Sequence, residues 1–135
     1  MKRILIFLAI SWFATTSGPL FAALGDTEED IAALFGKPVE TGFPDSKGIS
    51  TNRYQKGEYI ILVQFLHHLS LAESYTRVDK EEFSPKEIIA LLAGNSNGIE
   101  WDKDPENMEW RREDHKAHAW METLSGRPTL LFQAQ

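Results

Sequence analysis

The chain has 135 residues with 14 Lys or Arg and 20 Asp or Glu, so its formal net charge at pH 7 is −6. Dispersed negative charge keeps a protein soluble and repels phosphate backbones, which argues against a nucleic-acid partner. The sequence contains no cysteine, and this excludes a disulfide scaffold, a thiol catalyst, a cysteine-ligated zinc site and a lipid-bearing cysteine within it.

Residues 1–22 have the pattern of a secretory signal peptide. Basic Lys2 and Arg3 precede the apolar run ILIFLAISWF, and small residues follow as far as Ala22. The pattern predicts cleavage after Ala22, a single domain over residues 23–135, and a secreted or periplasmic location. The alternative is a retained membrane anchor, because residues 4–24 carry no charge and about 20 apolar residues span a bilayer. The Thr, Ser, Gly and Pro residues at 15–19 dilute that run and favour removal.

A short helix is predicted over residues 28–35. Thr27 is a suitable N-cap, and three acidic residues fill the first turn, where the helix dipole favours negative charge. An apolar stripe at helical spacing follows, made of Ile31, Leu34 and Phe35. Gly36 can adopt the left-handed conformation that follows a helix end, and Pro38 prevents continuation.

Three strands of an antiparallel meander are predicted after a loop at residues 39–51. The strand signals lie at 53–55, 59–66 and 70–78, with turns at KGE and HHL between them. In the middle strand, alternation separates two apolar faces, one with Tyr59, Ile61, Val63 and Phe65 and the other with Ile60, Leu62 and Leu66. A strand that is apolar on both faces is usually central or has its second face covered. We therefore expect the second face to be used between the two halves of the chain or against another molecule.

The second half of the chain shows the same order of elements. A helix is predicted to begin after Ser84, an N-cap followed by Pro85 and by Glu87 at the capping-box position, and to end at Gly94. Its apolar stripe consists of Ile88, Leu91 and Leu92. A loop at residues 95–107 precedes strand signals at 108–112, 117–123 and 128–133.

The recurrence suggests a tandem helix-strand-strand-strand repeat over residues 26–79 and 83–134. Thr27 and Ser84 correspond at the same offset as Ile31 and Ile88 and as Leu34 and Leu91. On this hypothesis Leu34 and Leu91 are equivalent core positions. The alternative is chance, since physical preferences favour such units in any chain. Either way the predicted fold class is α+β, with two helices packed on antiparallel β-meanders.

The stretch EEDIAALFGKPV, placed before a predicted meander, resembles the SmpA/OmlA outer-membrane-assembly family. The typical pattern of that family is a helix ending in a Leu-Gly-x-Pro turn before antiparallel strands, and the similarity here rests on Leu34, Phe35, Gly36 and Pro38. The chain lacks the lipid-bearing cysteine of the family and has one helix per unit where the family has two. A tandem form resembles the β-lactamase-inhibitor-protein architecture of two helix-plus-sheet units side by side, and the segments GKPV, VQF and AHAW are similar to small exported bacterial proteins. These resemblances imply a fold and a binding habit.

Two groups of residues invite a metal-site interpretation, and neither is favoured. Stacked meanders could bring together the imidazoles of His67, His68, His115 and His118, but histidines in turns are more often solvated. Asp102, Asp104, Glu106 and Glu113 match ligand positions of an EF-hand loop, yet Asn107 stands where glycine is needed and no helices flank the loop. No phosphate loop, nucleophile elbow or zinc-protease motif is present. We predict no metal, no cofactor and no catalytic residue.

Trp110, Arg111 and Arg112 are the candidate partner-binding residues, because Trp and Arg are enriched at binding hot spots. Trp120 is expected in the core, since a small domain needs aromatic residues there. The sequence thus predicts an exported, non-enzymatic binding or assembly module of the bacterial cell envelope with a protein partner. The alternatives are a proteinaceous inhibitor of an extracytoplasmic enzyme and, less favoured, a hydrolase whose site is assembled only in space. The oligomeric state is left open.

Overall fold

The computed structural model describes residues 24–135, so the signal-peptide prediction for residues 1–22 lies outside the described part. The described chain forms two helices and eight strands. The elements of the first half are α1 (Glu28–Phe35), β1 (Glu40–Thr41), β2 (Ile49–Lys56), β3 (Tyr59–Leu66) and β4 (Leu69–Arg77). Those of the second half are α2 (Pro85–Gly94), β5 (Trp101–Lys103), β6 (Glu109–Arg112), β7 (Ala117–Leu124) and β8 (Arg127–Ala134).

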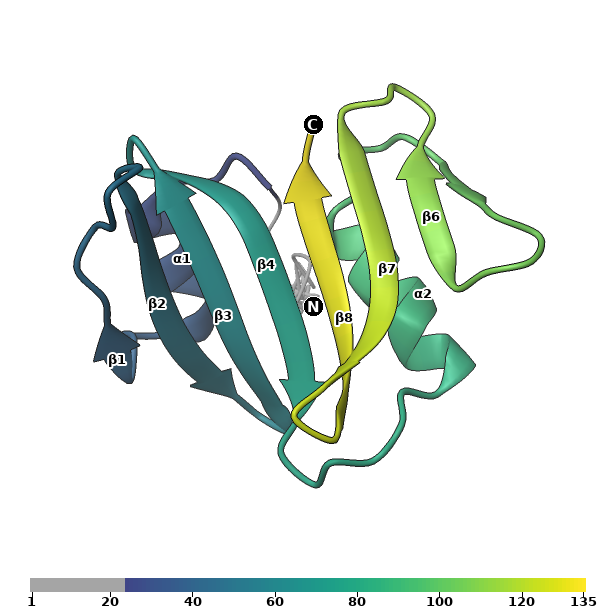
Figure 1. Ribbon diagram of the computed structural model, residues 1–135, viewed down its shortest axis with the longest axis horizontal. Coiled ribbons are helices and arrows are strands. Elements are labelled where there is room, and N and C mark those ends of the chain that lie inside the picture. Colours follow the sequence, from purple (N-terminus) through teal and green to yellow (C-terminus); the bar gives the residue numbers. More distant parts are fainter. Residues whose placement is uncertain (1–23) are drawn as a thin grey trace, which may run out of the picture.

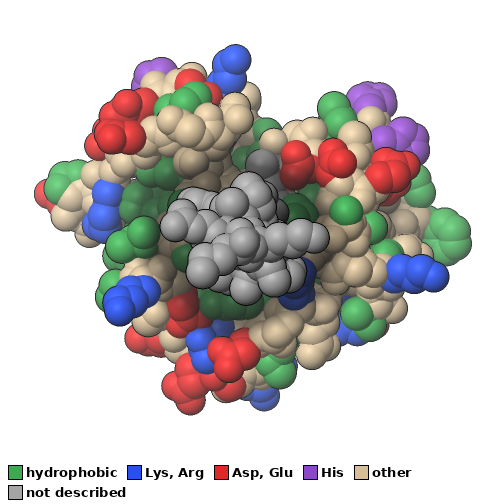
Figure 2. Space-filling model, turned by 180° about the vertical axis from the view of Figure 1, so that it is seen from behind, with side chains coloured by type: hydrophobic (Ala, Val, Ile, Leu, Met, Phe, Trp, Pro, Cys, Tyr) green, Lys and Arg blue, Asp and Glu red, His purple; other side chains and the backbone are tan. Residues whose placement is uncertain are grey.

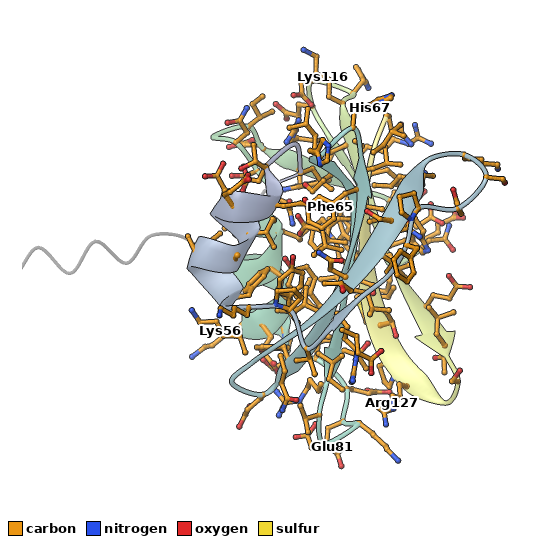
Figure 3. All side chains as sticks on the ribbon, turned by 90° about the vertical axis from the view of Figure 1, so that its left-hand side faces the viewer. Lys56, Phe65, His67, Glu81, Lys116 and Arg127 are labelled. Atoms are coloured by element: carbon orange, nitrogen blue, oxygen red, sulfur yellow. The ribbon has the colours of Figure 1, made fainter. Side chains whose placement is uncertain are left out.

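All eight strands belong to one antiparallel sheet in the order β1-β2-β3-β4-β8-β7-β6-β5. Both helices lie on the same face of this sheet, α1 behind the first half and α2 behind the second (Figure 1). Seen from the side, the helices form a layer of their own, and no helix of the described residues covers the opposite face (Figure 3). The predicted α+β class, with two helices on an antiparallel sheet, is therefore confirmed.

The two helices begin and end where their sequence signals predict. The hydroxyl of Thr27 accepts a hydrogen bond from the Asp30 N–H, and Gly36 ends α1 at a φ of 84°. At α2 the capping box is complete, because Ser84 and Glu87 each accept a hydrogen bond from the other's backbone N–H. These contacts are local in sequence, which is why the pattern alone could predict them.

Each half has one more strand than predicted. The segments 39–51 and 95–107 were expected as loops, but β1 and β5 lie within them, and β2 begins at Ile49. Both additional strands are short and lie at the edges of the sheet, where β1 pairs with β2 and β5 with β6. A strand of two or three residues has too few positions for an alternating pattern, so pairing with a longer neighbour determines it.

The core lies between the helices and the sheet and runs without a break through both halves. The predicted division of β3 into two faces is confirmed, because Ile61, Val63 and Phe65 of one face are all buried and Leu62 of the other is exposed. At the centre, the ring of Tyr75 on β4 meets the edge of Phe132 on β8 with 5.8 Å between ring centroids. The aromatic contact joins the two halves where β4 pairs with β8.

The expected equivalence of Leu34 and Leu91 is wrong in terms of burial. Leu91 is fully buried at 0% exposure, whereas Leu34 is half-buried at the side of the core. In α1 the fully buried position is Ile31, whose counterpart Ile88 is only half-buried. The two helices thus present different sides to the sheet, because the packing angle and not the spacing decides which residue of a stripe is central.

Candidate functional site

The three candidate partner-binding residues do not share a surface. Trp110 is 6% exposed and Arg112 is 8% exposed, and both lie on the helix side of β6. The Arg112 guanidinium donates hydrogen bonds to the Asp114 carboxylate at 2.9 Å and to the Asn95 carbonyl oxygen at 3.0 Å. Arg111 is exposed and, because side chains alternate along a strand, points to the opposite face. Trp110 and Arg111 still line one hollow of about 250 Å³ beside β5, but Arg112 is buried and engaged, so the three residues do not form a single contact surface.

The expectation that Trp120 is a core residue is also wrong. Trp120 is half-buried on the face of the sheet that the helices leave uncovered, where its ring stacks on His118 with 4.8 Å between centroids. Its indole N–H donates to the Glu122 carboxylate at 3.2 Å. It borders a shallow hollow of about 290 Å³ together with Leu62, Leu131 and uncharged polar side chains. Side chains alternate between the two faces of a strand, and the buried neighbour Ala119 points toward the helices, so Trp120 points to the opposite face.

A cleft of about 670 Å³ lies at the outer edge of the first half. One wall is the first turn of α1, and the other is the segment that leads from Pro38 through β1 into β2. The floor comes from β2 and β3, and the turn with His67 and His68 closes one end. The lining residues are Glu28, Glu29, Ala32, Pro38, Thr41, Gly42, Pro44, Gly48, Ser50, Asn52, Tyr54, Phe65, His67 and His68.

The floor of this cleft is rigid and carries two polar groups. Tyr54 and Asn52 are buried neighbours on the same side of β2, and the Asn52 amide donates to the Tyr54 hydroxyl at 3.2 Å. The Tyr54 ring packs against Phe35 of α1 with 5.8 Å between centroids. Burial raises the pKa of the Tyr54 hydroxyl, so the group stays neutral at physiological pH.

Two carboxylates lie at the opening of the cleft. Glu28 and Glu29 belong to the first turn of α1, and the His68 imidazole lies 3.6 Å from the Glu28 carboxylate. Figure 2 shows acidic side chains beside a pair of histidines at the upper right of the helix-side view. The site therefore combines apolar walls with concentrated negative charge at one end.

A loop with an exposed aromatic residue borders the cleft. Phe43 is 94% exposed and stands between Gly42 and Pro44, which both line the cleft. The Asp45 carboxylate accepts hydrogen bonds from the N–H groups of Lys47 and Ile49 at 2.8 and 3.0 Å. These bonds lower the pKa of Asp45, so it remains ionised and continues to hold the loop.

The base of the loop is held equally firmly. The Gly42 N–H donates to the Thr51 carbonyl oxygen at 2.8 Å, and a Cβ at position 42 would lie 2.7 Å from that oxygen. Only glycine permits this close approach, so the backbone beside Phe43 has a fixed course. The turn residues in GFPDSKG predict a loop, but nothing in the sequence shows that its aromatic residue faces solvent.

The described residues contain no group of three His, Asp or Glu side chains arranged to hold a metal ion. His67 and His68 lie in the β3–β4 turn, whereas His118 lies on β7 in the other half of the sheet.

Within residues 24–135, neither helix has the length and apolarity needed to cross a membrane.

A buried carboxyl group lies deeper, on the central strand β4. Glu73 is 2% exposed and accepts hydrogen bonds from the Tyr75 hydroxyl at 2.7 Å and the Asn95 amide at 3.3 Å. Among the described residues its second oxygen, Oε1, has no hydrogen-bond partner. Burial is the dominant effect on this group and raises its pKa to about 8.

No family model and no curated protein matches the chain. Among solved structures, a cysteine-rich secretory protein from Staphylococcus aureus aligns with 83% of this chain at 12% identity and a TM-score of 0.46. The chain spans 44% of the length of that protein. A DUF4309 family protein from Bacillus subtilis aligns with 82% of this chain and 79% of its own length at 12% identity and a TM-score of 0.43. Both scores are too low for either structure to support a statement about the function of this chain.

Proposed function

We propose that this protein is an exported, non-enzymatic module that binds another protein through Phe43 and the cleft beside it. The observation that carries the proposal is the 94% exposure of Phe43 on a loop whose backbone is fixed by hydrogen bonds. An exposed aromatic side chain on a fixed backbone has only two side-chain torsions to order on binding and buries a large apolar area, and aromatic residues are enriched in the cores of interfaces. The location of the module in the cell envelope rests on the signal-peptide pattern of residues 1–22.

The same loop favours a second candidate function, inhibition of an extracytoplasmic enzyme. An inhibitor needs a preorganised projection that enters a partner's cavity without reordering. The loop from Gly42 to Gly48 is short, projects from the sheet edge and carries its apolar side chain outward. Both functions use the same surface, and they differ in what the partner is.

Replacement of Phe43 by Ser tests the binding function. The change should leave the melting temperature nearly unaltered, because the side chain has no buried contacts to lose. Capture of the partner from an envelope extract should fall by about 30-fold, the effect of losing roughly 2 kcal/mol at a hot spot. Quantitative mass spectrometry of proteins bound to immobilised residues 23–135 measures this loss.

The matched control is Ile89→Ser, which removes an apolar side chain that is 67% exposed on α2, far from the loop along the chain. It should retain every captured protein. One enzyme captured at equal stoichiometry and losing its activity indicates inhibition, and a multi-protein complex indicates assembly. If the Phe43 variant retains the same proteins as the wild type, the proposed function is wrong.

We also propose that the two halves are a structural repeat. The strand order supports this. From each edge of the sheet to its centre the strands follow the chain order, β1 to β4 in the first half and β5 to β8 in the second, and β4 pairs with β8 at the centre. Each half also begins with a helix and a short edge strand. One rotation about an axis between β4 and β8 should superpose the crystallographic backbones of β2, β3 and β4 on those of β6, β7 and β8. A rotation that aligns one pair of strands but not the others contradicts the repeat.

A further inference from the structure

The carboxylates at the opening of the cleft lack a strong cationic partner. No Lys or Arg within residues 24–135 pairs with Glu28 or Glu29, and His68 is 3.6 Å from Glu28. Two cations of the adjoining strand β2 are engaged elsewhere, since Arg53 pairs with Glu40 at 2.6 Å and the Lys56 ammonium group donates to the Leu34 carbonyl oxygen. The negative charge at this end of the cleft is thus available to a ligand.

The charge balance of the opening favours a cation in spite of the helix terminus. The N-terminus of a helix is equivalent to about half a positive charge, and the two glutamates bring two full negative charges. The whole chain is acidic as well, with a formal charge of −6, which steers a basic partner toward it. An anionic ligand would be repelled by the two glutamates at short range and by the net charge of the chain at long range.

The walls of the cleft fit the stem of a long basic side chain. Ala32, Pro38 and Pro44 provide apolar surface next to the two carboxylates. Lys and Arg bury their methylene groups along such surface while the charged head stays at a polar end. The cleft offers the same two environments, an apolar surface for the methylene groups and two carboxylates for the charged head.

We propose that the cleft receives a lysine- or arginine-bearing segment of the partner protein, an inference that rests on the proposed binding function. The cation pairs with Glu28 and Glu29, while Phe43 enters an apolar pocket of the same partner. A partner protein fits better than a small polyamine because Phe43, next to two cleft residues, would stay in water if the ligand filled only the cleft.

Selection of a random peptide library on immobilised residues 23–135 provides the probe. The selected peptides should contain Lys or Arg beside apolar residues. Their dissociation constant should rise about tenfold or more for Glu28→Gln/Glu29→Gln, since charge-assisted hydrogen bonds are lost, and it should rise with salt. On the wild-type protein, replacement of the peptide's basic residue by norleucine should produce a similar loss, and this arm is independent of the folding of any variant.

The double variant Glu81→Gln/Glu82→Gln is the matched control. It removes the same charge from another exposed acidic pair, and Figure 3 places Glu81 at the opposite end of the molecule from His67. Its affinity for the peptides should stay within about threefold of wild type. An equal loss in both double variants would show general attraction to an acidic protein and overturn the inference.

Four further outcomes test the two proposals. If the selected peptides lose affinity for the Phe43→Ser variant but not for Glu28→Gln/Glu29→Gln, the proposed binding function holds and the proposal that a basic segment occupies the cleft is wrong. Peptides that ignore both changes overturn both proposals, and so does a library that yields no binder at this site. Spermidine that binds the cleft as tightly as the selected peptides would overturn a protein segment as the occupant.

Discussion

At the scale of single residues, the position with the largest physical consequence is Glu73. Its carboxyl group lies inside the core and forms hydrogen bonds to Tyr75 and Asn95, yet burial outweighs these bonds and raises its pKa from 4.5 to about 8. The folded state therefore holds a proton that the unfolded state releases between these two pH values. Because the folded state binds more protons there, stability falls as the pH rises through this window.

Replacement of Glu73 by Gln should remove this dependence. The free energy of unfolding of the wild type should fall, relative to that of Glu73→Gln, by at most about 1.4 kcal/mol per pH unit between pH 4.5 and 8. Below and above that window the two curves should run parallel. Urea titrations at half-unit steps of pH measure the difference, with the exposed Glu122→Gln as a control that follows the wild type. Parallel curves over the whole range would show that the Glu73 pKa is not raised.

At the scale of elements, α2 is held to the sheet by the residue that completes its cap. The Glu87 carboxylate accepts a hydrogen bond from the Ser84 N–H at 3.0 Å and pairs with Arg77 of β4 at 2.6 Å. It also accepts a hydrogen bond from the Tyr59 hydroxyl of β3. Burial and this bond to a carboxylate raise the pKa of Tyr59 well above its usual range. The helix start is thus tied to two strands of the other half.

Replacement of Ser84 by Ala should destabilise the protein by about 1 kcal/mol, because the Glu87 N–H loses its acceptor at the N-cap. Guanidinium titrations should show a lower midpoint with an unchanged slope. Ser46→Ala, in the exposed loop before β2, is the control and should match the wild type. An unchanged midpoint for Ser84→Ala would mean that the cap contributes nothing to stability.

At the scale of the whole molecule, the two halves share one core. Phe132 of β8 contacts Tyr75 of β4, and Trp101 lies 6.0 Å from Phe132 between ring centroids. The ion pair of Arg77 with Glu87 adds a second link between the halves. Neither half buries its side of the β4–β8 pair alone, so we expect one cooperative unfolding transition.

Replacement of Phe132 by Ala should lower stability by about 3–5 kcal/mol, since it opens a cavity where the halves meet. Trp101, Trp110 and Trp120 report on the second half by fluorescence, and amide hydrogen exchange in β2 and β3 reports on the first. Both probes should give the same lowered midpoint. Leu131→Ala, half-buried on the uncovered face, should have a much smaller effect. A second half that unfolds before the first would contradict a shared core.

The sequence by itself determined the local structure of this protein. The bounds of α1 and α2 follow from Thr27, Gly36 and the Ser84–Glu87 box, whose partners are at most a few residues away. The division of β3 into two faces follows from the alternation of its side chains. Neighbouring residues decide these features, so a pattern in the chain is sufficient to predict them.

Only the tertiary structure decided where the side chains of the candidate site lie. Trp110, Arg112 and Trp120 are residues of the kind that occur in cores and at hot spots alike, and the side of the sheet that the helices cover determines which role each takes. The cleft joins Glu28 of α1 with Pro44 and His67, which are distant in the chain, and the exposure of Phe43 depends on what the rest of the fold leaves uncovered. Edge strands, helix orientation and surface hollows arise from contacts between distant segments, and no local spacing records those contacts.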